Sequence, residues 1–243
     1  MKILILGGTG EARQLAHKLH ICGHEVITSL AGRTQGPILP DGAVRIGPFG
    51  GVAGLVAYLR AEAIERLVDA THPYAGQMSV NAVAAATQVS VPLVRYMRPQ
   101  WTPLPGQDWI HVASAQGAAH ILPREATVLL STGHDGLDFY RMRTDCRFLL
   151  RVIEAPGEAL PPNMLMIRSR PPYHLDDEIA LMRDHGITHL VSKNSGGSQT
   201  EAKLIAAQRL GVQVVMIARP DYAPALEVGG VDAVLEALGM SAR

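Results

Sequence analysis

The segment KILILGGTGEAR, residues 2–13, joins an apolar run to a turn that contains three glycines. Residues 3–6 are all apolar, which predicts a buried strand, and apolar residues at 12, 15, 16 and 19 have the spacing of an amphipathic helix. A glycine turn between strand and helix lets backbone N–H groups and the helix dipole meet a pyrophosphate. This context favours nucleotide binding over an ordinary structural turn.

The turn departs from the GxGxxG pattern at one position. Aligned on Gly8 and Gly10, the third glycine falls at Arg13, so Ala12 has to supply the small residue that lets helix and strand pack closely. The cofactor contacts predicted for this turn are Gly8, Thr9, Gly10, Glu11 and Ala12.

The end of the second predicted strand indicates which dinucleotide is bound. Proteins that bind NAD at such a glycine turn usually place a carboxylate about 20 residues after the glycines, where it binds the ribose hydroxyls. Residues 28–33, TSLAGR, contain no carboxylate, whereas Thr28, Ser29 and Arg33 offer hydroxyl and guanidinium donors that suit a 2′-phosphate. NADPH is therefore predicted, and the missing acid also counts against S-adenosylmethionine. The alternative for Arg33 is a solvated loop residue.

A second glycine turn follows the third predicted strand. Residues 47–51, GPFGG, repeat the arrangement of strand and glycine turn. Gly50 and Gly51 either line the cofactor with their backbone or only turn the chain, and the sequence favours neither reading.

The fourth predicted strand runs into DATHPYA, residues 69–75, at the carboxyl edge where doubly wound proteins bind ligands. Ala70 and Thr71 are predicted beside the cofactor. His72 and Tyr74 could bind a carboxylate or deliver a proton. The alternative is that Thr71 caps the next helix and His72 only satisfies a loop carbonyl.

Short apolar runs alternate with helix-period segments along most of the chain, which is typical of α/β units around a parallel sheet. The predicted strands are residues 2–6, 25–29, 43–46, 67–70 and 91–95 in the first half, and 127–131, 148–153, 189–192 and 212–217 in the second. Prolines crowd residues 92–105 between the halves. We predict two Rossmann-like parallel-sheet α/β domains with an interdomain cleft: an NADPH-binding domain, residues 1–98, and a second domain, residues 99–243, that contributes to substrate binding.

Two strand ends in the second half are also polar. Residues 131–134, STGH, and residues 192–197, SKNSGG, are small, hydroxyl-rich turns with a basic residue, suited to binding carboxylates. Lys193 is one of only four lysines, and Arg95 and Arg151 likewise stand at strand ends. Further along, the spacing of Ser198 and Glu201 predicts a capping box for a helix over residues 201–210.

The composition indicates a large apolar core without charge imbalance. Of 243 residues 47% are hydrophobic and 5% aromatic, and 22 Lys+Arg balance 22 Asp+Glu, which argues against nucleic-acid binding. Cys22 and Cys146 have neither zinc-site nor disulfide-framework spacing, so no metal is predicted. The chain has no apolar run of the roughly 18 residues that a membrane span needs. The short apolar run at residues 3–6, followed by glycines, predicts a buried strand and not a signal peptide. We expect a cytoplasmic protein with no membrane partner.

Several enzyme classes are excluded by their motifs. No tyrosine is followed four residues later by lysine, so the catalytic pair of short-chain dehydrogenases is absent. A serine nucleophile elbow, an HExxH zinc site and a P-loop are absent as well. A nicotinamide site together with carboxylate-binding turns remains.

Five segments in fixed order carry a resemblance to a known family. They are GGTGEA at residues 7–12, DATHPYA at 69–75, Arg95 with RPQW at 98–101, STGH at 131–134, and SKNSGG through TEAK at 192–203. The ordered set, spread from residue 1 to 220, resembles the precorrin-6A reductase family of cobalamin biosynthesis.

The resemblance implies an NADPH-dependent oxidoreductase that saturates one C=C bond of precorrin-6A, giving precorrin-6B. A hydride from the nicotinamide and a proton add to neighbouring carbons of a large polycarboxylate tetrapyrrole. The candidate proton donors are His72, Tyr74, His134 and solvent. The substrate-binding residues it suggests are His72, Arg95, Ser131, Thr132, Gly133, His134, Arg151, Ser192, Lys193, Asn194 and Ser195.

Two alternatives stay open. The natural substrate could be cobalt-precorrin-6A, because the metal would lie inside the substrate. A non-catalytic NADP(H)-sensing protein could also be built on the same glycine turn, although it would not need the second set of polar strand ends. The expected assembly is a monomer or a small homo-oligomer.

Overall fold

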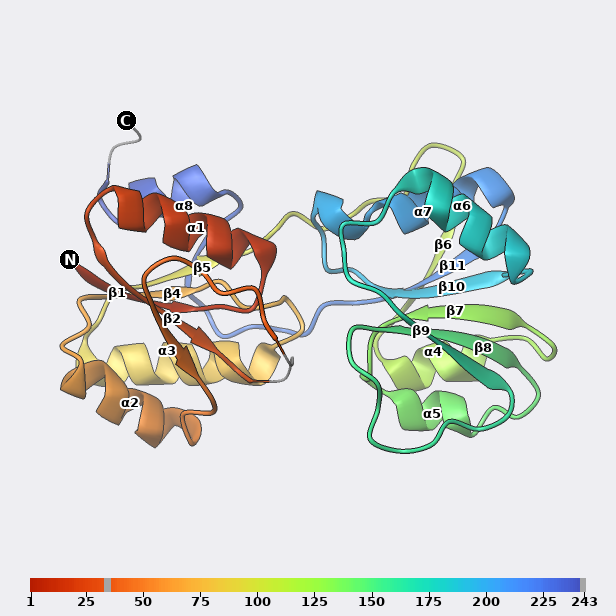
Figure 1. Cartoon of the computed structure of the whole chain (residues 1–243), viewed down its shortest axis with the longest axis horizontal. Coiled ribbons are helices and arrows are strands. Elements are labelled where there is room, and N and C mark those ends of the chain that lie inside the picture. The colour runs from red at the N-terminus through yellow and green to blue at the C-terminus, as the bar shows by residue number, and fades with distance from the viewer. Residues whose placement is uncertain (33–35, 241–243) are drawn as a thin grey trace. The chain divides into compact units, whose positions relative to one another are not determined.

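The computed structural model describes residues 1–32 and 36–240, which form two units (Figure 1). Unit 1 contains Met1–Pro99 and the chain from Pro220 onward, and unit 2 contains Gln100–Arg219. Each unit holds one six-stranded sheet in which the paired strands run parallel, with helices on both faces. The predicted class, two Rossmann-like parallel-sheet α/β domains, is confirmed.

Unit 1 is built around the strand order β12-β5-β4-β1-β2-β3. Its strands are β1 (Lys2–Leu6), β2 (Glu25–Leu30), β3 (Ala43–Ile46), β4 (Arg66–Asp69), β5 (Leu93–Tyr96) and β12 (Leu226–Val228). Its helices are α1 (Gly10–Ile21), α2 (Gly51–Ala61), α3 (Gly76–Val89) and α8 (Val231–Ala237). Figure 1 shows α1 and α8 on one face of this sheet and α2 and α3 on the other.

The alternation of side chains along β1 explains why both faces of the unit 1 sheet are covered. Ile3 and Ile5 pack in a core with the apolar stripe of α1 and with α8. Leu4 and Leu6 point the other way, into a core with α2 and the alanines of α3. A strand that is apolar at every position is what a sheet buried on both faces requires. The glycine turn after β1 therefore starts from a rigid position.

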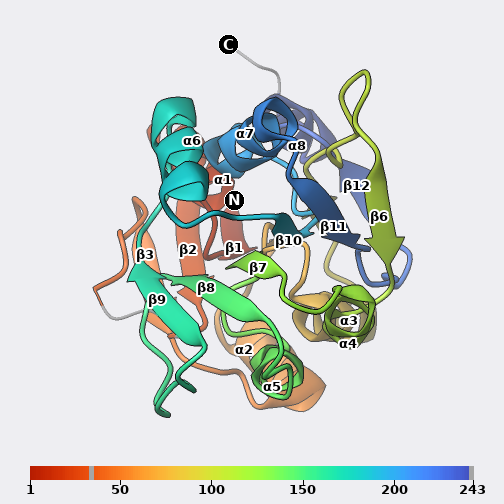
Figure 2. The ribbon, with the colours of Figure 1, turned by 90° about the vertical axis from the view of Figure 1, so that its right-hand side faces the viewer.

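Unit 2 has the strand order β6-β11-β10-β7-β8-β9. Its strands are β6 (Trp109–Val112), β7 (Thr127–Ser131), β8 (Arg147–Val152), β9 (Met164–Arg168), β10 (His189–Lys193) and β11 (Gln213–Ile217). Its helices are α4 (Ala115–Ile121), α5 (Leu137–Arg141), α6 (Leu175–Asp184) and α7 (Ala202–Leu210), with a short 3₁₀ turn, η1 (Ser198–Thr200). Helices α6 and α7 cover one face of the sheet, and α4 and α5 cover the other (Figures 1 and 2).

The C-terminal segment corrects the predicted domain division. Residues from Pro220 belong to the first unit and not to a continuous domain of residues 99–243. Strand β12 pairs in parallel with β5, and Val234, Leu235 and Leu238 pack in the α1 core. The chain therefore crosses between the units twice, after Pro99 and after Arg219.

The predicted capping box is also wrong. Ser198 begins the 3₁₀ turn η1, and Glu201 is the N-cap of α7 without a side-chain capping bond. A side-chain N-cap is present instead at the first helix. Thr9 caps α1, and its hydroxyl accepts the N–H of Ala12 at 3.1 Å.

Residues 1–32 and 36–240 contain neither a candidate membrane span nor a candidate metal cluster. None of the helices there has the length and apolar character that a bilayer span demands. Within the same ranges, His, Cys, Asp and Glu side chains form no group of three or more that could hold a metal ion.

Candidate functional site

The glycine turn of unit 1 is open beside its backbone. Gly8 has φ +109°, a conformation that side chains rarely allow, and a Cβ built there would meet no atom within 4 Å. At Gly7 a Cβ would lie 2.7 Å from Cγ2 of Thr28, so β1 and β2 can approach only with glycine at that position. Since the turn leads directly into α1, the first amides of that helix can face an anion.

Thr9 and Ala12 fix the turn from behind. The Thr9 hydroxyl donates to the carbonyl of Ala70 at 2.9 Å while it accepts from Ala12, so β4 and the helix start are tied together. Ala12 is 1% exposed and packs in the core with Ile3 and Ile5. It occupies the close-packing position that the glycine pattern assigns to its third glycine.

Glu11 lies in the first turn of α1, where its negative charge would disfavour a pyrophosphate, but its carboxylate forms an ion pair with Arg98. Nη1 of Arg98 donates to both of its oxygens, at 3.0 and 3.2 Å, and both side chains are mostly buried. Burial raises the pKa of the nearby Tyr96 hydroxyl, and Glu11 raises it further while Arg98 opposes this. The contact neutralises Glu11 and attaches residue 98 to the glycine turn.

The end of β2 lies beside the turn, since the N–H of Gly7 donates to the carbonyl of Ser29 at 2.9 Å, and β3 pairs with the far side of β2. Thr28 is 1% exposed, and its Oγ1 has no hydrogen-bond partner among the described residues. Ser29 is in register with Arg45 of β3, whose Nη1 donates to the Ser29 hydroxyl at 3.3 Å. Arg33, predicted to hold a 2′-phosphate, lies outside the described residues. The sequence reasoning missed Arg45, although it also stands near a strand end.

The second glycine turn leads into α2. Gly50 is the left-handed N-cap of that helix and Gly51 its first residue, and a Cβ at either would meet no atom within 4 Å. The turn is thus open on its outer side, as at Gly8.

The end of β4 holds a buried ion pair that the sequence reasoning did not foresee. Asp69 is 1% exposed and accepts the N–H and hydroxyl of Thr71, at 3.2 and 2.7 Å. Nε of Arg95 lies 3.4 Å from Asp69, and its Nη1 lies 2.7 Å from Glu227. Arg95 is itself only 1% exposed. Through these two carboxylates Arg95 ties β4 to β12. Its contact with substrate stays a prediction.

His72 and Tyr74 follow on the same loop. His72 is exposed, and its Nδ1 accepts the N–H of Tyr74 at 3.2 Å, with the two rings 5.8 Å apart. Since Nδ1 accepts a hydrogen bond, the neutral ring carries its proton on Nε2. Thr71 does not cap α3, because that helix begins at Gly76 with Ala75 as its N-cap.

Unit 2 brings its two polar strand ends together. Ser131 and Ser192 are in register on neighbouring strands β7 and β10. Nζ of Lys193 lies 2.7 Å from a carboxylate oxygen of Asp135, which follows His134 in the other turn. His134 is exposed, and its Nε2 lies 2.6 Å from the carbonyl oxygen of Glu154. A carbonyl only accepts, so this nitrogen of His134 is a donor.

Three polar residues predicted at the β10 end are buried. Ser192 is 0% exposed, and its hydroxyl donates to the carbonyl of Lys193 at 3.2 Å. Asn194 is 4% exposed, and its amide bonds both the N–H and the carbonyl of Trp101, at 2.8 and 3.1 Å. Ser195 is 8% exposed. The side chains of Ser192 and Asn194 support the loop from inside. Their contact with a ligand stays a prediction.

Arg151, like Arg95, is buried and paired with a carboxylate of the chain. It makes two hydrogen bonds to Glu178, at 3.0 and 2.7 Å, and both side chains are at most 5% exposed. Its guanidinium also lies 4.3 Å from the ring centre of Tyr173. Arg151 therefore joins β8 to α6. Its contact with substrate stays a prediction.

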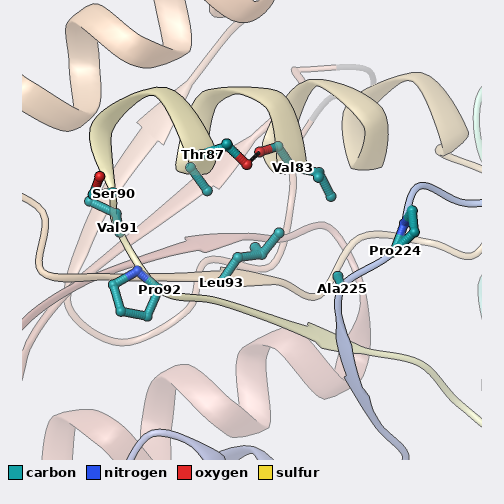
Figure 3. Close-up of a pocket in the computed structure, with 9 residues that line it drawn as sticks. Val83, Thr87, Ser90, Val91, Pro92, Leu93, Pro224 and Ala225 are labelled. Carbon is teal, nitrogen blue, oxygen red and sulfur yellow. Dashed lines mark hydrogen bonds between the residues drawn. The ribbon is translucent and has the colours of Figure 1, made fainter.

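Figure 3 shows a pocket of unit 1 that contains none of the predicted site residues. Val83 and Thr87 line it from α3, and Leu93 and Ala225 line it at the start of β5 and just before β12. The amino ends of parallel strands lie at the edge opposite the glycine turn. The pocket therefore lies away from the candidate site.

Comparisons with known proteins agree on one family. The family model described as "Precorrin-6x reductase CbiJ/CobK" matches residues 2–239. A "Precorrin-6A reductase" of Rhodococcus erythropolis is 48% identical over 228 residues, covering 93% of this chain and 92% of its own. A solved structure described as "CobK precorrin-6A reductase" has a TM-score of 0.94 and 40% identity, covering 100% of this chain and 99% of its own. A "Cobalt-precorrin-6A reductase" of Priestia megaterium is 26% identical over 232 residues, covering 90% of each chain.

Proposed function

This chain belongs to the precorrin-6x reductase family, and from that membership we propose that it reduces precorrin-6A to precorrin-6B in cobalamin biosynthesis, with NADPH as the reductant. The observation that carries the proposal is the glycine turn at residues 7–11, with its open Gly8 and its capped helix start. The reaction adds a hydride to one carbon of a C=C bond and a proton to its neighbour.

The residues around the turn fit a phosphorylated dinucleotide. Gly8 leaves space for a pyrophosphate, and the first amides of α1 offer N–H donors to it. The buried, unpartnered Oγ1 of Thr28 and the Ser29 hydroxyl lie where a ribose is held in this fold. When bound, NADPH supplies the hydride, and these residues orient it. The proposed cofactor contacts are Gly8, Thr9, Gly10, Glu11, Ala12, Thr28, Ser29, Arg33, Gly50, Gly51, Ala70 and Thr71, with Glu11 acting through its backbone.

His72 is the proton donor that the contacts favour. Its Nδ1 is fixed as an acceptor by the N–H of Tyr74, so the proton is held at Nε2 of an exposed ring. In neutral His134, by contrast, the proton lies on Nε2 and is directed at the Glu154 carbonyl. Tyr74 then serves to orient His72 through its backbone.

Substrate carboxylates are assigned to the polar turns of unit 2. Nζ of Lys193 lies 2.7 Å from Asp135; the lysine side chain is 15% exposed and the carboxylate side chain 64%. A substrate carboxylate would take the place of Asp135 beside this ammonium group. The partly accessible residues assigned to this task are Ser131, Gly133, His134 and Lys193, with Thr132 and Ser195 at their margin.

Metal-free precorrin-6A is the preferred substrate over its cobalt complex. The relative named for precorrin-6A is 48% identical to this chain, whereas the relative named for the cobalt form is 26% identical over a similar span.

The test is to incubate the purified protein with NADPH and precorrin-6A, and in parallel with cobalt-precorrin-6A. We expect loss of nicotinamide absorbance coupled to a change in the macrocycle spectrum, faster with the metal-free substrate. Turnover of only the cobalt form would reverse the substrate assignment. Tight NADPH binding without turnover of either would overturn the reductase proposal in favour of a sensing protein.

A further inference from the structure

Arg45 is a partly buried cation at the carboxyl edge of unit 1. Its side chain is half-buried. Among the described residues, no carboxylate lies within salt-bridge distance of its guanidinium. Arg95 and Arg98, at and after the end of β5 in the same unit, are in contrast both paired with Asp or Glu. A charge held partly out of water without a counter-ion is unfavourable unless something else supplies the negative charge.

The guanidinium is held in place by neutral groups. Nη1 donates to the carbonyl of Gly47 at 2.5 Å and to the Ser29 hydroxyl at 3.3 Å, and Nη2 donates to the carbonyl of Pro48 at 2.7 Å. Its carbon lies 3.8 Å from the ring centre of Phe49. These contacts use three of the five N–H donors of an arginine, so two remain for a ligand.

The location selects the ligand. Ser29 is in register with Arg45, so the guanidinium lies across the end of β2, where the ribose of a bound dinucleotide is recognised. Ser29 accepts from Arg45, which leaves its own hydroxyl hydrogen to donate. Next to it, Thr28 Oγ1 is buried and has no partner within the described part of the chain. Hydroxyl and guanidinium groups donate hydrogen bonds to phosphate oxygens, and the absence of a carboxylate removes the charge that would repel a phosphate.

We propose that Arg45, supported by Ser29, binds the 2′-phosphate of the dinucleotide and so sets the preference for NADPH over NADH. The inference rests on the proposed function for the presence of a dinucleotide, and it adds the residue that discriminates between its two forms. Arg45 comes from β3, 12 residues beyond the Arg33 to which the sequence alone pointed.

The experiment measures binding and needs no macrocycle. Dissociation constants for NADP⁺ and NAD⁺ are determined by calorimetry for the wild type and for Arg45→Ala, Arg45→Lys and Arg33→Ala. We expect Arg45→Ala to weaken NADP⁺ about 10- to 100-fold, which is what losing one or two hydrogen bonds to a charged group costs, and NAD⁺ little. Arg45→Lys should recover part of the loss, because it keeps the charge but not the paired donors.

The matched control is Arg66→Ala. Arg66 is an arginine of the same unit at the start of β4, on the opposite edge of the sheet, and it donates to the carbonyl of Glu65. It should leave both constants unchanged, which separates local recognition from the loss of one positive charge. Thermal unfolding of each variant shows whether it is folded.

Three results would overturn the inference. Equal losses for both dinucleotides in folded Arg45→Ala would make Arg45 a structural residue. Loss of selectivity in Arg33→Ala alone would assign the phosphate to Arg33, and a wild type with no preference for NADP⁺ would remove the phosphate site altogether. Failure of the reductase reaction is a separate outcome, because selective NADP⁺ binding that depends on Arg45 would survive it.

Discussion

Two histidines at the carboxyl edges of the sheets differ in which nitrogen holds the proton. His72 accepts the N–H of Tyr74 on Nδ1, whereas His134 is bonded through Nε2 to the Glu154 carbonyl. A general acid needs its proton on an atom that can reach the substrate. In neutral His134 that atom faces the Glu154 carbonyl, whereas in neutral His72 the proton is on Nε2, the nitrogen that does not bond Tyr74.

Replacing His72 therefore tests the proton path. We expect His72→Gln to lower kcat about 10²–10⁴-fold, the usual contribution of a positioned acid, while the KM for NADPH hardly changes. The matched change His134→Gln should act mainly on the KM for the macrocycle. Steady-state kinetics over a range of pH measure both. A larger fall in kcat for His134→Gln would exchange the roles, and unchanged kcat in both variants would leave solvent as the donor.

At the residue scale, the sequence indicates which residues stand at the ends of strands but not which of their side chains are buried against partners from distant segments. Gly8 and Lys193 were recognisable because their residue types are unusual at those places. Arg95 and Arg151 also stand at strand ends, but their partners Asp69, Glu227 and Glu178 come from distant segments. A guanidinium at a strand end can serve a ligand or a buried carboxylate, and only the fold decides which.

At the scale of elements, the strands that the pattern missed share one property. Strands β6, β9 and β12 are all edge strands of their sheets. An edge strand is covered less than a central one, and in these three at most one residue is fully buried. A polar residue interrupts the short apolar sequences of β6, WIHV, and β12, LEV, whereas β9, MLMIR, has an apolar run but stays mostly exposed. The central strands, which position the candidate site, were predictable for the same physical reason.

The Arg151–Glu178 pair is a prediction about how elements are joined. Glu178→Gln leaves a buried guanidinium without its charge partner, and we expect a loss of about 3–5 kcal/mol in the free energy of unfolding unit 2. The control Arg168→Ala removes a pair in which the arginine is 60% exposed, and should cost about 0–1 kcal/mol.

Both changes in the free energy of unfolding are measured by urea titration, with hydrogen exchange of the β8 and α6 amides as the local probe of unit 2. Below its unfolding transition, Glu178→Gln should keep the wild-type KM for the macrocycle. A raised KM with unchanged stability would instead place Arg151 at the substrate site.

At the scale of the whole molecule, both connections between the units are fastened to one residue. The side chain of Asn194 bonds Trp101 on the first connection, and its carbonyl accepts Nε of Arg219, which precedes the second, at 2.7 Å. At the other end of the first connection, Arg98 is attached to Glu11 of the glycine turn. No local sequence pattern predicts these contacts. The second connection exists only because the short strand β12 pairs with β5 of unit 1.

Asn194→Ala should therefore affect the reaction more than cofactor binding. Freeing residues 100–101 loosens the connections, so we expect kcat/KM for the macrocycle to fall at least about tenfold, with limited proteolysis faster near residues 99–105. The Kd for NADP⁺ should stay within about twofold, since its proposed contacts lie in unit 1. The control Asn163→Ala removes another amide that bonds main-chain carbonyls of unit 2, those of Arg143 and Cys146, next to the start of β9. If Asn163→Ala lowers kcat/KM as much, the effect of Asn194 is general destabilisation of unit 2, and the two connections have no special part in turnover.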